Sequence, residues 1–226
     1  MELSRKQQEI IVALALTLVW PVWLLNGFYM AALAKISMPL FWLVDIGQWV
    51  LLPSLLLIAL ARRSGILPHH YAYAWPIADT WQLLKDTALV FITGYMAYAS
   101  AWLFWALLGH SLAEFSWAQT FPAGWLGTLT WLYASVTAGL VESVFFISLP
   151  WLLYRSVLTR QDRRPNRDVF AVLVSLVFAL AHWEQGAHIV AAAFCFNTVM
   201  CAWFFQLRTL WPIAIAHILI DLIAFA

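Results

Sequence analysis

The chain contains apolar runs that are too long for the core of a soluble domain. One of them, residues 187–207, has no Asp, Glu, Lys or Arg. A helix needs about 20 mostly apolar residues to cross the hydrocarbon core of a bilayer. The whole chain is 64% hydrophobic and only 10% charged, with a mean hydropathy of +0.83. We therefore expect an all-α protein, a polytopic bundle of helices integral to a membrane.

The apolar runs predict about seven transmembrane helices, within a range of six to eight, with boundaries uncertain by several residues. The predicted spans are 10–34, 38–61, 87–108, 125–154, 169–183, 187–207 and 211–226. No internal repeat or low-complexity tail divides them. We expect a single transmembrane domain over residues 1–226.

The basic residues predict the orientation, because Lys and Arg near span ends are retained on the cytoplasmic side. With seven spans and a cytoplasmic N-terminus, Lys35 is the only one of the 12 lysines and arginines that falls outside. The C-terminus then lies outside, and the chain fits a bacterial plasma membrane. The net charge of +1 argues against nucleic acid as a partner.

Four polar residues, Glu142, His182, His217 and Asp221, interrupt the apolar runs of the C-terminal half. Ionisable groups at membrane depth are costly, so they usually face a cavity and mark a functional site. Counted from the cytoplasmic ends of their predicted helices at 1.5 Å per residue, all four lie roughly 14 to 21 Å deep. His217 and Asp221, four residues apart, share one helix face. We expect the four side chains to meet in one layer.

The order of three motifs resembles the CAAX protease and bacteriocin-processing family of intramembrane proteases, which includes the type II CAAX prenyl endopeptidases. The family pattern is Glu-Glu-x-x-x-Arg, then Phe-x-x-x-His, then His-x-x-x-Asn. Here the second motif is Phe178–His182 and the third is His217–Asp221. The resemblance implies a protease core at about 125–226 and assigns Glu142, His182, His217 and Asp221 as the catalytic residues.

The chain departs from the family pattern at three positions. Ser143 and Ile147 replace the second Glu and the Arg, which are four apart on a helix and would pair. Losing both members of a buried ion pair can be neutral, whereas losing one is severe. Asp221 stands where the family more often has Asn. An ionised Asp cannot donate to an oxyanion, so Asp221 is protonated, orients His217 or binds a cation.

The resemblance implies that the protein hydrolyses a peptide bond in a membrane-associated protein or peptide, lipidated or not. Glu142 would act as general base on a water held also by His182, while His217 and Asp221 would polarise the carbonyl. No cofactor is then needed. A metalloprotease is the alternative, because His182, His217, Asp221 and Glu142 also form an acceptable zinc ligand set.

Two other classes of function stay open at this point. The degenerate first motif also fits a relative that binds membrane proteins without cleaving them. A transporter would also keep carboxylates and histidines at mid-depth, but no repeated halves are evident. His217 and Asp221 are also compatible with a self-satisfied structural pair. For Asp45 and Gln48, a hydrogen bond between helices is favoured over a place in the cavity.

Overall fold

The computed structural model describes residues 4–73, 79–109, 120–161 and 165–225, and in these parts the regular structure is entirely helical. Five of the described helices are long and apolar enough to cross a membrane: Lys6–Leu24, Met38–Ser64, Thr80–Leu107, Trp125–Leu158 and Ala187–Leu207. These findings confirm the predicted all-α membrane bundle.

The N-terminal part of the chain folds as two antiparallel helical segments with one break and one π-helical turn. A capping box of Ser4 and Gln7 starts the first helix. The elements are α1 (Arg5–Leu24), α2 (Asn26–Ile36), α3 (Met38–Ile46), the π-helix η1 (Gly47–Leu51), α4 (Leu52–Ser64) and the short 3₁₀ helix η2 (Pro68–Tyr71).

The predicted span 10–34 is not one continuous helix. It breaks at Leu25, between α1 and α2, and only Lys6–Leu24 qualifies as a membrane span. The indole N–H of Trp183 donates to the carbonyl oxygen of Leu24 at 2.8 Å, so a distant side chain binds the end of α1. The sequence around Leu25 gives no sign of this long-range contact.

The remainder of the chain is a series of helices in which the long fourth span changes its winding halfway. The elements are α5 (Thr80–Leu107), α6 (Trp125–Thr137), the π-helices η4 (Ala138–Glu142) and η5 (Val144–Ser148), α7 (Leu149–Arg160), α8 (Arg167–Leu180), the 3₁₀ helix η6 (Trp183–Gln185), α9 (Ala187–Leu207) and α10 (Trp211–Ala224). Every predicted span therefore contains a helix.

Two of the predicted spans are shorter than the others. Helices α8 and α10 have 14 residues each, or about 21 Å of straight helix against a hydrocarbon core of about 30 Å. Both pack against longer helices, α8 on α9 and α10 on α5 and η4. Whether all seven cross the bilayer stays a prediction.

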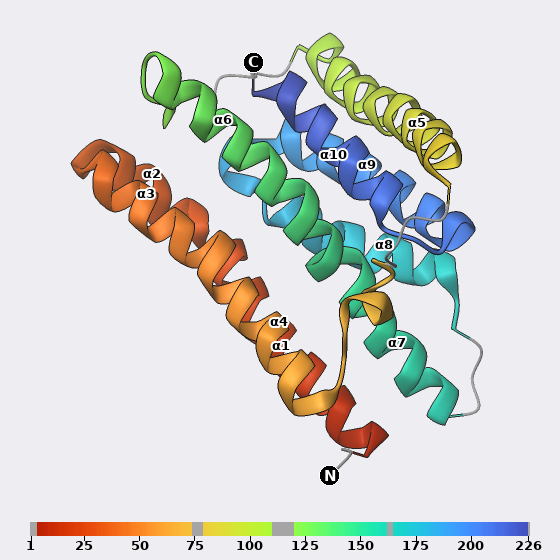
Figure 1. Cartoon of the computed structure of the whole chain (residues 1–226). Coiled ribbons are helices and arrows are strands. Elements are labelled where there is room, and N and C mark those ends of the chain that lie inside the picture. The colour runs from red at the N-terminus through yellow and green to blue at the C-terminus, as the bar shows by residue number, and fades with distance from the viewer. Residues whose placement is uncertain (1–3, 74–78, 110–119, 162–164, 226) are drawn as a thin grey trace.

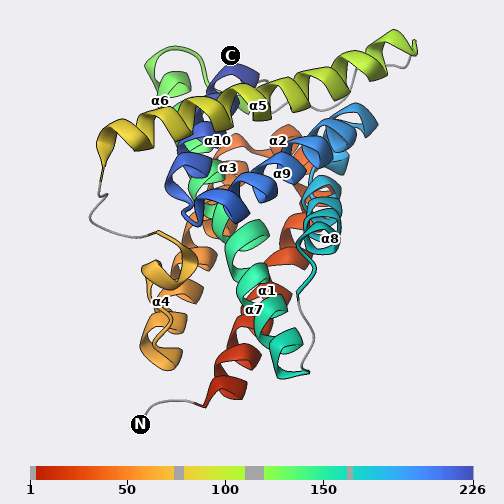
Figure 2. The same cartoon turned by 90° about the vertical axis from the view of Figure 1, so that its right-hand side faces the viewer.

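The helices form two groups on either side of the α6–α7 segment (Figure 1). One group contains α1 to α4, and the other contains α5, α9 and α10. Figure 2 shows α5 running across the molecule, over α9 and α10, with which it makes extensive contact. The two chain ends lie at opposite ends of the molecule in both views.

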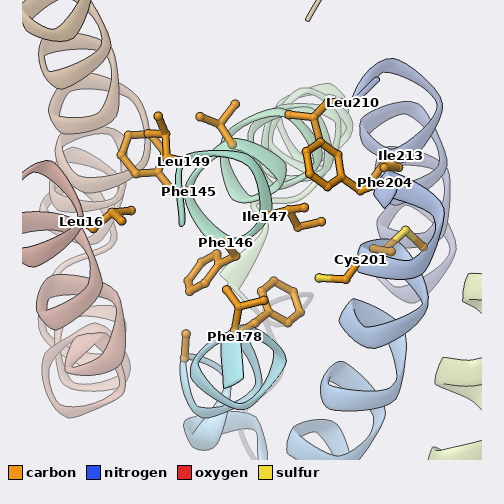
Figure 3. Close-up of a cluster of buried hydrophobic side chains, with 14 of the residues drawn as sticks. Leu16, Phe145, Phe146, Ile147, Leu149, Phe178, Cys201, Phe204, Leu210 and Ile213 are labelled. Carbon is orange, nitrogen blue, oxygen red and sulfur yellow. The ribbon is translucent and has the colours of Figure 1, made fainter. Parts of the chain in front are cut away.

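The core is centred on the π-helical segment η5. Figure 3 shows that its consecutive residues Phe145, Phe146 and Ile147 point to different neighbours. Phe146 lies against Phe178 of α8, with ring centroids 5.1 Å apart, and Ile147 faces Cys201 of α9 (Figure 3). The side chains of Phe145, Phe146 and Ile147 are at most 2% exposed. This packing fixes the turn that directly follows Glu142.

Candidate active site

Glu142 is the last residue of the π-helix η4 and is only 5% exposed. A π-helical turn is wider than an α-helical turn, is rare, and is found frequently at functional sites. Here η4 and η5 follow each other with Ser143 between them. The irregular winding therefore occurs at Glu142, the only carboxylate of the first motif that this chain retains.

Gly139, in the same π-helix, lets α10 approach the backbone next to Glu142. A Cβ atom at this position would lie 2.4 Å from Cγ1 of Ile218 and 2.7 Å from the carbonyl oxygen of Ala214. The second of these contacts involves backbone, which cannot move away as a flexible side chain can. The missing side chain thus allows close packing between the helix that carries Glu142 and the helix that carries His217.

The structure brings Glu142, His217 and Asp221 together around one nitrogen atom. Nε2 of His217 lies 3.6 Å from Oε2 of Glu142 and 3.5 Å from Oδ2 of Asp221. Both distances exceed those of direct N–H···O hydrogen bonds. Neither carboxylate oxygen has a hydrogen-bond partner among the described residues. Two buried carboxyl oxygens without a protein partner thus lie beside one imidazole and are available to a substrate or a water.

His182 lies in the same cavity, in the turn after α8, and is held by the last turn of that helix. Its Nδ1 is 2.9 Å from the carbonyl oxygen of Phe178. A carbonyl oxygen only accepts, so in the neutral ring Nδ1 carries the proton and Nε2 is an acceptor. The ring of Phe178 lies between the two histidines, with centroids 4.7 Å from His182 and 6.2 Å from His217. The recorded polar contact of His182 is therefore to the backbone rather than to a carboxylate.

The four predicted residues line one cavity of about 110 Å³. A single water needs only about 10–15 Å³ of such space, so there is room for several. Aromatic rings form part of the wall, among them Trp42, Trp49, Tyr98, Phe178, Phe196 and Phe225. Four ionisable side chains thus share one cavity inside otherwise apolar helices, which is the setting that such groups require at membrane depth.

Ser143 and Ile147, which replace the ion pair of the family pattern, are both uncharged and both have suitable surroundings. The hydroxyl of Ser143 donates to the carbonyl oxygen of Gly139 at 2.6 Å. Ile147 is 2% exposed and belongs to the apolar core. With neither partner left as an unpaired buried charge, the two replacements avoid the main cost of breaking such a pair.

A loop from the N-terminal half supports the turn that carries Glu142. The hydroxyl of Tyr73 donates to the carbonyl oxygen of Leu140 at 3.2 Å. Burial raises the pKa of Tyr73, so its hydroxyl keeps the proton that it donates. The carbonyl oxygen of the neighbouring Ala72 accepts from the backbone N–H of Leu210 at 2.9 Å, just before α10. One loop thus contacts both of the segments that form the site.

Several cavity residues were not expected from the sequence. Asn26, Tyr133 and Glu184 line the cavity together with the predicted residues. Asp45 makes the predicted hydrogen bond between helices, accepting from the hydroxyl of Tyr133 at 2.8 Å, yet it lines the cavity as well. Gln48 is not among the lining residues. Asn26 gave the same signal as the four chosen residues, a polar side chain inside an apolar run.

The metal alternative finds no ready-made site in the described part of the chain. There, no group of three or more His, Cys, Asp or Glu side chains is arranged so that it could hold a metal ion. Nδ1 of His182 is held by the carbonyl oxygen of Phe178, and His217 contacts each of the two carboxylates. Nε2 of His182 stays available as a ligand in this arrangement, so the metal alternative stays a proposal to be tested.

Fold and cavity together define an integral membrane protein with a buried site of carboxylates and histidines. The comparison with known families agrees with this class. Residues 123–223 match the model of the family described as Type II CAAX prenyl endopeptidase Rce1-like. For this segment of the chain, the match confirms the family that the motifs suggested.

Neither a curated protein nor a solved structure matches the chain. The family is one of proteases, so at the level of the family the activity is that of a CAAX-type intramembrane endopeptidase. The corresponding class of substrate is a membrane-associated peptide. Glu142, His182, His217 and Asp221 all lie inside the matched segment.

Proposed function

We propose that the protein is a glutamate-dependent intramembrane endopeptidase that cleaves a membrane-associated protein or peptide. The observation that carries this proposal is the contact of Glu142 and Asp221 with the same nitrogen of His217, inside a cavity within the bundle. The family match of residues 123–223 supports the reaction class. The proposal does not depend on lipidation of the substrate, and it involves no cofactor.

In the first step, the Glu142 carboxylate accepts a proton from a water, and the water oxygen forms a bond to the scissile carbonyl carbon. His182 orients this water, because its Nε2 is the acceptor that remains when Nδ1 donates to Phe178. General base catalysis of this kind contributes about 10²- to 10⁴-fold to a rate. The carbonyl π-electrons move to oxygen and give a tetrahedral oxyanion.

The oxyanion is stabilised by hydrogen bonds from His217 and Asp221. Asp221 takes part as the protonated acid, because a second negative charge next to Glu142 would be repelled strongly in a medium of low polarity. Its Oδ2 and Nε2 of His217 are 3.5 Å apart and can donate to one site. The proton on Glu142 then passes to the amide nitrogen as the C–N bond breaks, which gives a carboxyl group and an amine.

The positions of the chain ends and the basic residues support one orientation of the protein in the membrane. The opposite positions of the two chain ends (Figure 1) support a cytoplasmic N-terminus and an external C-terminus, as the basic residues predict. A bacterial plasma membrane fits this orientation. Proteolysis of right-side-out and inverted vesicles, read with tags at either end, tests the orientation.

The decisive experiment compares the purified wild-type protein with Glu142→Gln in liposomes, against a library of membrane-anchored peptides. We expect Glu142→Gln to lower the cleavage rate by about 10²- to 10⁴-fold and to leave peptide binding intact. Asp168→Asn, an exposed carboxylate on α8, is the matched control and should cleave normally. Tight binding without cleavage by the wild type would favour the non-catalytic relative instead.

A strong chelator separates the two catalytic alternatives. The proposed mechanism predicts unchanged cleavage after chelation and dialysis, because each step is carried out by side chains. A loss of cleavage that is restored by zinc would contradict it and would place His182, His217, Asp221 and Glu142 around a metal.

A further inference from the structure

A second polar group lies in the same cavity, away from Glu142. It contains Asp45, with its carboxylate held by the hydroxyl of Tyr133 at 2.8 Å, and Asn26, and both line the cavity. Asp45 and Asn26 are 4% and 2% exposed. Neither belongs to the segment that matches the family model, and the proposed hydrolysis uses neither of them.

The charge of the cavity is one-sided. Asp45, Glu142, Glu184 and Asp221 provide four carboxyl groups, and no Lys or Arg occurs among the described residues that line it. Carboxylates at membrane depth usually pair with an opposite charge. The composition of the wall therefore favours a positively charged ligand over an acidic one.

Asn26 gives an independent indication of a ligand that donates hydrogen bonds. Its side-chain Oδ1 is buried and has no hydrogen-bond donor within the described residues. A buried acceptor without a partner lowers stability, and such a group is retained most readily where a ligand satisfies it. Asn26 Oδ1 and the Asp45 carboxylate are both acceptors, so the complementary group carries several N–H donors.

The aromatic wall next to Asp45 fits the same ligand. Trp42 and Trp49 line the cavity and come from the same span, three residues before and four residues after Asp45. Indole rings are the aromatic groups that attract ammonium and guanidinium ions most strongly. A neutral apolar side chain would leave the Asn26 acceptor unpaired, and an acidic one would be repelled by Asp45.

The distance along the helix places this group relative to the proposed reaction. Tyr133, which binds Asp45, precedes Glu142 by nine residues on the same continuous helical segment, or about 13 Å at 1.5 Å per residue. An extended peptide covers this distance in about four residues at 3.3 to 3.6 Å each.

We propose that Asn26 and Asp45 form a subsite for a lysine or arginine side chain of the substrate, about four residues from the cleaved bond. The proposal rests on the proposed endopeptidase function and specifies its substrate class. Tyr133 is a positioning residue in it, because it orients the Asp45 carboxylate.

The test measures binding separately from cleavage. Membrane-anchored peptides with lysine three, four or five residues on either side of the central bond are compared with the same peptides carrying norleucine. Binding is followed by fluorescence anisotropy with Glu142→Gln in nanodiscs of zwitterionic lipid, which excludes attraction by a charged membrane surface. We expect at least one lysine peptide to bind about tenfold or more tightly than its norleucine counterpart.

Two further variants make the result specific to the subsite. Asp45→Asn keeps an acceptor for Tyr133 but removes the charge, so the preference for lysine should disappear while norleucine peptides bind as before. Asn26→Leu removes the unpaired acceptor, so it should weaken lysine binding while the thermal stability stays the same or rises. A merely structural role for Asn26 predicts a loss of stability instead.

The outcomes distinguish the two proposals. Peptides that bind with an Asp45-dependent preference for lysine, but are not cleaved by the wild type, would leave the subsite standing and contradict the protease. Cleavage without any preference for a basic residue would support the protease and contradict the subsite. The subsite is overturned if no lysine peptide binds more tightly than its norleucine counterpart, or if the preference survives Asp45→Asn.

Discussion

The two polar groups of the cavity are held in place in different ways. Asp45 has a direct side-chain partner, the hydroxyl of Tyr133. Nε2 of His217 lies 3.6 Å from Glu142 and 3.5 Å from Asp221 without such a bond, and the positions of these three residues depend on helix packing at Gly139 and around η5. One group is thus oriented by a hydrogen bond, and the other is oriented by backbone contacts that leave its acceptors available for chemistry.

Of the substitutions considered below, those of Asp221 should change the rate of cleavage the most. Asp221→Leu removes a donor to the oxyanion and should lower kcat by about 10²- to 10³-fold. Asp221→Asn retains an N–H donor and should keep kcat within about tenfold of the wild type. Steady-state kinetics of both variants on one membrane-anchored peptide is the measurement.

The opposite ranking of these variants would change the assigned role. If Asp221→Asn were as inactive as Asp221→Leu, the carboxylate would be needed in its ionised form to orient His217. Asp168→Asn is again the control for the loss of a carboxylate at an exposed position.

Gly139→Ala should disturb only the group that depends on packing. Its Cβ would meet the Ala214 carbonyl oxygen at 2.7 Å, so α10 must shift, and a shift of about 1 Å at a reaction centre can cost about 10²-fold in rate. Overpacking of this kind also lowers stability by about 1–3 kcal/mol. Kinetics and thermal unfolding in detergent measure both effects.

Gly47→Ala is the matched control, because a Cβ there would meet nothing within 4 Å. Gly47 lies two residues after Asp45 in the chain, and the substitution should leave activity and stability nearly unchanged. Equal effects of the two alanines would contradict the idea that the contact at Gly139 holds the site together.

Tyr73→Phe should give the smallest effect. It removes the hydrogen bond to the Leu140 carbonyl, for which we expect a loss of about 0.5–1.5 kcal/mol in stability and a fall of a few-fold in kcat with KM unchanged. Tyr154→Phe, in α7, is the comparison, because the contacts recorded for Tyr154 are ring contacts. If both variants cleave like the wild type, the loop does not position the turn around Glu142.

The sequence predicted the parts of the molecule that depend on local pattern. Apolar run length located every described α-helix, although it joined α1 and α2 into one span. The four-residue spacing placed His217 and Asp221 on one face. The proximity of Glu142 to His217 followed from equal depth in an apolar medium, where polar side chains gather. The contacts in the structure agree with this prediction, while the catalytic roles stay a proposal.

Two of the missed features depend on contacts between distant residues. The break at Leu25 coincides with a bond from Trp183, 158 residues further on, and Gly139 matters only because Ala214 and Ile218 lie against it. The π-helical turns are irregularities of winding that no hydrophobic period encodes. Asn26 shows the same pattern as the four chosen residues, a polar side chain inside an apolar run, whereas Tyr133 reads as an ordinary residue of a membrane helix.

The contact of Trp183 with the first helix pair has a consequence for how the chain can be recombined. The loop that follows His182 packs on Gly27, where a Cβ would lie 2.6 Å from Cβ of Glu184 and 2.7 Å from the indole of Trp183. The segment 123–223 therefore packs in part against residues that lie outside it. In chimaeras with relatives, we expect the C-terminal half to fold correctly only when Gly27 and the helix break at Leu25 are transferred together with the loop after His182.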